Sequence, residues 1–245
     1  MSSIAQSLEK IRNRVTVLEH RYGRPAGAVR VLAVSKTKPA EAVRAAAEAG
    51  QRDFGENHVQ DALSKLDALA DLDLVWHFIG PIQSNKTRIV ATRFDWVHSL
   101  DRTKIASRLS EQRGEDLPPL NVCIQVNVSG EPSKSGIAPA ELDAFAQFVA
   151  GLPRLKLRGL MTLPRPCDEL ALQRRPFAAL REMLEGLNAG GFGLDTLSMG
   201  MTDDMEAAIA EGATIVRIGT AIFGAREPAS PSAGPARVSG SRPPG

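Results

Sequence analysis

Short apolar segments alternate with longer amphipathic segments along most of this chain. The apolar segments lack the polar–apolar alternation of a half-exposed sheet, which indicates parallel strands that are covered on both faces. The amphipathic segments repeat apolar residues at spacings of three and four, as helices do. The pattern predicts strands at residues 31–36, 53–57, 74–79, 96–98, 120–126, 155–162, 196–198 and 214–218. It predicts helices at residues 3–22, 40–49, 58–69, 84–91, 102–112, 140–150, 168–187 and 203–210.

Strands that alternate with helices pair in parallel through right-handed crossovers. Eight such units in a chain of 245 residues match the size of a closed (β/α)8 barrel, a TIM barrel, here preceded by an N-terminal helix. An open doubly wound sheet is the alternative architecture. No Gly-x-Gly-x-x-Gly follows the first strand, which weakens that alternative.

The end of the chain has a different composition. Residues 227–245 contain five prolines, three glycines and four serines, and Val238 is their only large apolar residue. Such a segment cannot bury enough surface to offset its ordering entropy. We therefore expect one barrel domain at residues 1–226 and a disordered tail at residues 227–245.

Bulk composition excludes several function classes. A net charge of +2 and an aromatic fraction of 4% give no support for nucleic-acid binding. No apolar run has the length of a signal peptide core or a membrane span, so a cytoplasmic protein without membrane contact is expected. Cys123 and Cys167 lie far apart without metal-ligand spacing, and we expect buried thiols rather than a disulfide.

The first strand ends on a lysine. Leu32, Val34 and Lys36 lie on one face of an extended strand, and Pro39 ends it because proline donates no backbone hydrogen bond. Most lysines are merely solvated. In α/β barrels, however, ligands bind at the carboxyl ends of strands, so the position of Lys36 favours a chemical role.

The turns after strands seven and eight can hold an anion. Ser198 offers a hydroxyl group, and Gly200 and Gly219 let backbone amides come close to a phosphate. We expect Asp203 to cap the next helix, with Glu206 completing a capping box. Lone glycines are also common in simple tight turns, so these residues alone leave both interpretations open.

Arg217 favours the anion site. Ile215, Arg217 and Gly219 share one face of strand eight, which directs Arg217 into the mouth of the barrel. Strand eight lies beside strand one once the barrel closes, so Arg217 becomes a neighbour of Lys36. A lysine, an arginine and a phosphate cradle together suggest pyridoxal phosphate (PLP) as a cofactor.

Five segments resemble the pyridoxal phosphate homeostasis protein family. The segment from His77 to Lys86 is a specific signature, and the resemblance spans roughly residues 4–224. The segments are Ala33-Val34-Ser35-Lys36-Thr37, Phe54-Gly55-Glu56-Asn57, Trp76-His77-Phe78-Ile79-Gly80-Pro81-Ile82-Gln83-Ser84-Asn85-Lys86, Leu197-Ser198-Met199-Gly200-Met201 and Arg217-Ile218-Gly219-Thr220.

The resemblance implies a single barrel like the N-terminal domain of alanine racemase. It implies PLP held as a Schiff base on Lys36, with no settled enzymatic activity and a role in the balance of vitamin B6 and amino-acid pools. It further implies that Asn57 lies beside the cofactor, that Ser198, Gly219 and Thr220 hold the phosphate, and that Arg217 lies at the ring nitrogen. We add Gly200, from the turn after strand seven, to the expected cofactor-binding residues.

Three functions remain to be compared: a PLP carrier, a PLP-dependent amino-acid racemase and a Schiff-base aldolase. A racemase needs a base on each face of the substrate carbon, and the chain has a single tyrosine, Tyr22, which precedes the barrel. We expect a monomeric carrier, with PLP-dependent apoenzymes as recipients. We interpret His77 as a core residue, although it could neighbour the cofactor, and Lys134 as a candidate for handing the cofactor on.

Overall fold

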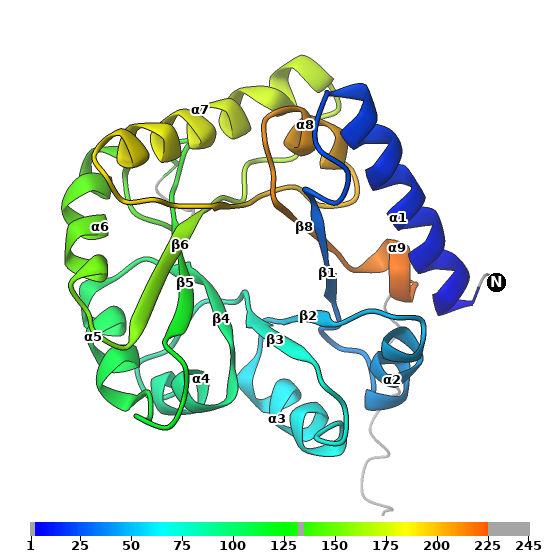
Figure 1. Cartoon of the computed structure of the whole chain (residues 1–245), viewed down its shortest axis with the longest axis horizontal. Coiled ribbons are helices and arrows are strands. Elements are labelled where there is room, and N and C mark those ends of the chain that lie inside the picture. The colour runs from blue at the N-terminus through cyan, green and yellow to red at the C-terminus, as the bar shows by residue number, and fades with distance from the viewer. Residues whose placement is uncertain (1–2, 132–134, 225–245) are drawn as a thin grey trace, which may run out of the picture.

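The strands of the structure, a computed structural model that describes residues 3–131 and 135–224, form a closed parallel barrel (Figure 1). Each strand pairs with the next one along the chain, and β8 pairs with β1 to close the barrel. The closed order confirms the predicted (β/α)8 fold and excludes the open sheet. The strands are β1 Arg30–Val34, β2 Asp53–Glu56, β3 Val75–Phe78, β4 Trp96–Leu100, β5 Leu120–Gln125, β6 Leu155–Met161, β7 Thr196–Ser198 and β8 Ile215–Ile218.

The helices surround the strands (Figure 1). Two short helical elements were not predicted from the sequence, namely α9 after the last strand and a 3-10 helix at Pro139–Glu141. The α-helices are α1 Ile4–Arg21, α2 Ala40–Glu48, α3 Val59–Ala68, α4 Thr87–Arg93, α5 Thr103–Gln112, α6 Leu142–Ala150, α7 Leu170–Ala189, α8 Met205–Ala210 and α9 Thr220–Phe223.

The main core lies between the outer face of the barrel and the helices. Alternate strand residues point outward, and most of them are buried there, as the unbroken apolar segments predicted. These outward residues include Ala33, Phe54, Phe78, Val97, Val122, Leu160, Leu197 and Val216. Each large apolar side chain buried in this way stabilises the fold by roughly 1.5–3 kcal/mol.

Helix α1 covers the closure of the barrel. Its apolar residues at spacings of three and four are buried, and it packs near α2, α8 and α9 (Figure 1). Ser3 caps the helix by accepting a hydrogen bond from the backbone N–H of Gln6 at 3.2 Å, and the Gln6 side chain accepts one from the Ser3 backbone. This capping box satisfies backbone donors that the first turn leaves free.

Two local predictions are wrong. Strand β1 ends at Val34, so Lys36 lies in the following turn rather than in the strand, and Thr37 has a φ of 63° there. Helix α8 begins at Met205, and no Asp203–Glu206 capping box forms. The Asp204 carboxylate instead accepts a hydrogen bond from the backbone N–H of Met201 at 2.5 Å, which closes the turn one residue later than predicted.

The described helices are all too short or too polar to span a lipid bilayer. Both cysteines are free thiols; Cys123 is buried in the barrel and Cys167 is half-buried. Burial raises the pKa of the Cys123 thiol to about 12. The predicted disordered tail at residues 227–245 lies outside the described residues.

Candidate functional site

A cavity of about 580 Å³ opens at the carboxyl ends of the strands. Five of the seven residues that the sequence proposed as a site line it, although they come from three separate parts of the chain: Lys36, Asn57, Arg217, Gly219 and Thr220. Its position agrees with the end of the barrel at which ligands bind in this fold class.

Lys36 lies at the rim of the cavity with an exposed side chain. It follows Ser35, which is completely buried, and the backbone N–H of Ser35 donates a hydrogen bond to the carbonyl oxygen of Gly55 at 3.0 Å. The turn beyond Lys36 closes with a hydrogen bond of 3.0 Å from the backbone N–H of Lys38 to the carbonyl oxygen of Ser35. The lysine therefore projects from a tightly held turn into an accessible space.

A buried ion pair supports this turn from the helix side. Lys65 on α3 donates hydrogen bonds to the carbonyl oxygen of Ser35 at 2.7 Å and to the Glu56 carboxylate at 2.6 Å. Ser35 Oγ donates to the same carboxylate oxygen at 2.5 Å. Burial raises the pKa of Glu56, and the charge of Lys65 acts against that shift. The ion pair thus joins β1, β2 and α3 directly behind Lys36.

Arg217 is a buried cation in the wall of the cavity, with 4% of its surface exposed. Its guanidinium group donates to Ser198 Oγ at 2.8 Å and to the carbonyl oxygen of Thr162 at 2.9 Å. No carboxylate of the described residues forms an ion pair with it. Burial lowers the pKa of Arg217 to about 10, so the side chain remains charged at neutral pH. A buried cation held by neutral oxygens alone favours an anionic or electron-rich ligand.

Asn57 lines the cavity and carries an unsatisfied acceptor. Its Oδ1 atom is buried and has no hydrogen-bond partner in the part of the chain that the structure describes. Gly80, which also lines the cavity, allows this approach, because a Cβ atom there would lie 2.1 Å from the carbonyl oxygen of Asn57. An unpaired buried acceptor is costly, so a ligand donor at this position would stabilise the site.

Gly219 joins β8 to α9, and Thr220 begins α9, both at the cavity wall. Gly219 has an ordinary negative φ of −111°, and its role is close packing, because a Cβ atom there would lie 3.3 Å from the carbonyl oxygen of Val34. The turn thereby brings the end of β8 against the end of β1, which carries Lys36 into the same space.

Ser198 and Gly200 do not line the cavity. The Ser198 side chain is completely buried inside the barrel, between Arg217 and His98. Gly200 has a φ of +92°, and a Cβ atom there would lie 2.5 Å from the Cβ atom of Ala208 on α8. Ser198 therefore contacts Arg217, and Gly200 permits a tight turn against α8.

The structure adds residues that sequence reasoning did not select. Thr37, Lys38 and Thr202 line the cavity beside the predicted residues, and Asp203 lies exposed at its edge. Thr202 offers a hydroxyl group in the turn where Ser198 was expected to provide one. The sequence signal was present, since Thr202 lies within the same glycine-containing turn, but only the three-dimensional turn shows which hydroxyl group faces the cavity.

His77 is a core residue, as interpreted from the sequence. Its ring is completely buried, and both ring nitrogens have partners, Asp53 and His98. Lys134, the candidate for handing a cofactor on, lies outside the described residues. Tyr22, the single tyrosine of the chain, does not line the cavity and donates a hydrogen bond to Glu206 at 3.0 Å.

Residues 6–227 match the family model described as alanine racemase, N-terminal domain. The alanine racemase of Corynebacterium glutamicum has the same fold, with a TM-score of 0.67 and 19% identity over 89% of this chain and 62% of that one. The chain is thus a barrel of the alanine racemase N-terminal domain class.

Relatives with higher sequence identity identify the family within this class. The pyridoxal phosphate homeostasis protein of Pseudomonas aeruginosa is 62% identical over 232 residues, which cover 95% of this chain and 100% of that protein. The structure of PipY from Synechococcus elongatus with PLP bound superposes with a TM-score of 0.80 and 39% identity, over 91% of this chain and 100% of that one. This chain belongs to the pyridoxal phosphate homeostasis protein family.

Proposed function

We propose that this chain binds pyridoxal 5'-phosphate in the cavity at the carboxyl ends of the strands and buffers or supplies it in the cytoplasm. One observation carries the proposal: an accessible amine, Lys36, and a buried cation, Arg217, lie in the wall of one cavity. Among the described residues, no carboxylate forms an ion pair with Arg217. Asn57, whose buried Oδ1 atom has no partner among the described residues, lines the same cavity. These groups fit a ligand that carries an aldehyde, a phosphate and a pyridine ring.

Each lining residue has a distinct part in this proposal. PLP supplies an aldehyde that condenses with a lysine amine, with loss of water, to give a Schiff base. Lys36 provides that amine. Thr220 and the backbone of Gly219, with Thr202 opposite, hold the phosphate, and Arg217 faces the ring nitrogen. We assign Ser198 to the support of Arg217, and Gly200 to the turn that carries Thr202.

The same wall supports a carrier rather than a racemase. Apart from Lys36, the proton-accepting side chains among the described lining residues are Lys38 and the exposed Asp203. A cation beside the ring nitrogen disfavours its protonated form, and an unprotonated ring is a weaker electron sink for carbanion chemistry. We therefore propose a monomer that holds PLP, delivers it to PLP-dependent apoenzymes and thereby affects amino-acid balance, without turnover of its own.

A transfer experiment tests this function. The full chain is loaded with PLP, freed of unbound cofactor by gel filtration and mixed with the apo form of a PLP-dependent aminotransferase. Activity should return in proportion to the carrier added, and Lys36→Ala put through the same steps should restore none. Lys104→Ala, an exposed lysine on α5, is the matched control and should behave as the unchanged protein does. A loaded protein that retains no cofactor, or that never restores the apoenzyme, would contradict the proposal.

A further inference from the structure

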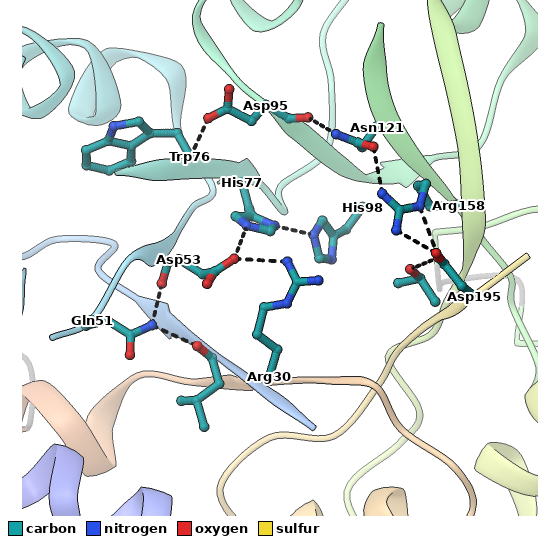
Figure 2. A network of polar contacts seen from close by, with 12 residues as sticks. Arg30, Gln51, Asp53, Trp76, His77, Asp95, His98, Asn121, Arg158 and Asp195 are labelled. Carbon is teal, nitrogen blue, oxygen red and sulfur yellow. Dashed lines mark hydrogen bonds and ion pairs between the residues drawn. The ribbon is translucent and has the colours of Figure 1, made fainter. Parts of the chain in front are cut away.

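A line of hydrogen bonds crosses the interior of the barrel to Arg217. Asp53 Oδ1 lies 3.1 Å from His77 Nε2, and His77 Nδ1 lies 2.8 Å from His98 Nε2 (Figure 2). His98 Nδ1 lies 2.7 Å from Ser198 Oγ, which in turn accepts from Arg217 at 2.8 Å. The line begins at the first residue of β2 and ends at the cavity wall near the end of β8, so it connects the two ends of the barrel.

Asp53 determines the direction of this line at its first end. Arg30 donates to Asp53 Oδ1 at 3.2 Å, and burial, which raises the pKa of Asp53, is outweighed by His77 and Arg30, so that the carboxyl pKa lies below its ordinary value. An ionised carboxylate can only accept a hydrogen bond. His77 Nε2 must therefore carry a proton. In a neutral ring His77 Nδ1 then accepts, and His98 must donate to it from Nε2.

Arg217 favours the same direction at the other end. A guanidinium group has only donors, so Ser198 Oγ accepts from it. Among the described residues, the remaining hydrogen bond of Ser198 Oγ is to His98 Nδ1, and the hydroxyl proton has an acceptor there only if that nitrogen is unprotonated. The Asp53 end thus requires, and the Arg217 end favours, the state in which each imidazole carries its proton on Nε2.

The surroundings keep the two imidazoles neutral. Burial lowers the pKa of His77, and it lowers that of His98 well below the ordinary value, with the cations of Arg217 and Arg30 acting in the same direction on His98. His77 also stacks on Trp96 with ring centroids 5.4 Å apart. A proton added to His77 would make its Nδ1 a donor and would force His98 to donate to Ser198, which leaves the hydroxyl proton without an acceptor.

We propose that Asp53, His77, His98 and Ser198 are positioning residues, which form one directed chain of hydrogen bonds that orients the Arg217 guanidinium group at the cofactor cavity. Its effect on a bound cofactor rests on the proposed function, whereas the chain itself is a property of the ligand-free protein. The role of Asp53 is remote. It lies at the opposite end of the barrel from the cavity, where it lines a separate shallow hollow of about 370 Å³ together with Arg30 and Gln51.

Histidine tautomers in the ligand-free protein test the chain directly. The imidazole nitrogen-15 shifts of the full chain, labelled at histidine, distinguish protonated from unprotonated ring nitrogens. The other two histidines of the chain, His20 and His58, are exposed and serve as internal references outside this hydrogen-bonded line. His77 and His98 should both show a protonated Nε2 and an unprotonated Nδ1, unchanged between pH 6 and 8. A protonated Nδ1 in either ring would overturn the proposal.

A matched pair of variants tests the positioning role. Asp53→Asn replaces a group that can only accept by an amide that can also donate, so the direction of the hydrogen bonds is no longer fixed at this end. Asp195→Asn removes a carboxylate that pairs with Arg158 at the same end of the barrel but lies outside the line of hydrogen bonds (Figure 2). Asp53→Asn should give a mixture of tautomers in both rings and weaken PLP binding by about threefold to tenfold, the equivalent of one net hydrogen bond. Asp195→Asn should leave the tautomers and the PLP affinity as they are. Equal PLP affinity in the two variants would refute the positioning role.

The histidine tautomers and the PLP affinity distinguish this proposal from the proposed function. Protonated Nε2 atoms in a protein that fails to bind PLP would support the directed line of hydrogen bonds and contradict the proposed function. PLP binding with the opposite tautomers would support the proposed function and contradict the directed line of hydrogen bonds. If Asp53→Asn does not fold, the tautomers of the unchanged protein still decide.

Discussion

Lys65 donates a hydrogen bond of 2.7 Å to the carbonyl oxygen of Ser35, the residue immediately before Lys36. The same ammonium group forms a buried ion pair with Glu56, in which the two side chains are 5% and 0% exposed. A helix lysine thus holds the turn from which the cavity lysine projects. Removing one partner of such a pair leaves a buried charge without compensation.

Lys65→Met should therefore destabilise the fold by about 3–5 kcal/mol, measured as the free energy of unfolding in urea. The double variant Glu56→Gln, Lys65→Met should recover much of that loss, because it removes both charges. The folded-state pKa of Glu56 already lies above its ordinary value and should rise further without Lys65, so stability falls as the pH rises through that pKa. The cost of Lys65→Met should thus be smaller at pH 5 than at pH 8. Equal cost at both pH values would show that Lys65 does not lower the pKa of Glu56 in the folded protein.

Arg217→Gln should weaken PLP binding by about tenfold to 100-fold. The substitution replaces a charged donor by a neutral one, and a hydrogen bond to a charged group contributes about 1.5–3 kcal/mol. The absorption band of the bound cofactor should also shift, because the cation that disfavours protonation of the ring nitrogen is lost. Equilibrium dialysis and absorption spectra measure both effects, with the exposed Arg88→Gln on α4 as a control. An unchanged affinity and spectrum would remove Arg217 from the cofactor site.

The protein should not racemise amino acids at an enzyme-like rate. Racemisation requires a proton acceptor on one face of the substrate carbon and a donor on the other, and Lys36 can serve only one face. Tyr22 is engaged with Glu206 and does not line the cavity. Incubation of the PLP-loaded protein with L-alanine in deuterium oxide, followed by chiral analysis, measures the rate. Many equivalents of D-alanine per site, dependent on Lys36, would overturn the carrier function.

Truncation after Arg226 should leave PLP affinity within about twofold of that of the full chain, the range expected for changes away from a site. The segment removed, residues 227–245, has Val238 as its only large apolar residue and contains none of the proposed cofactor-binding residues. Titration of both proteins with PLP, followed by absorption, makes the comparison. Loss of binding on truncation would place the tail in the site.

The strand pattern predicted correctly that the Arg217 side chain points into the barrel, because successive side chains of a strand alternate between its two faces. Ile215 and Arg217 are buried and face inward, and Leu32 of β1 pairs with Arg217 in register. The same rule failed at Lys36, because it applies only within a strand and β1 ends at Val34. Local patterns thus located the faces of strands but not the exact points at which strands give way to turns.

The polar contacts behind the site could not be predicted from local pattern. His98 on β4 and Ser198 on β7 belong to strands that are not neighbours in the sheet. Their side chains are in contact because both point into the interior of the closed barrel. Lys65 lies in a helix segment in which a lysine ordinarily remains solvated, and its burial depends on how α3 packs against β1 and β2. Such contacts depend on register and helix placement rather than on residue spacing.

The site of covalent attachment tests the proposed cofactor site most directly. The PLP-loaded full chain is reduced with borohydride, digested and mapped by mass spectrometry, in parallel with Lys36→Ala and with the matched control Lys104→Ala. We expect a reduced pyridoxyl group on Lys36 in the unchanged protein and in Lys104→Ala, and loss of the label and of the yellow colour in a folded Lys36→Ala. A label on Lys38 or on another lysine of the unchanged protein, or an equally strong label in Lys36→Ala, would contradict the proposed site.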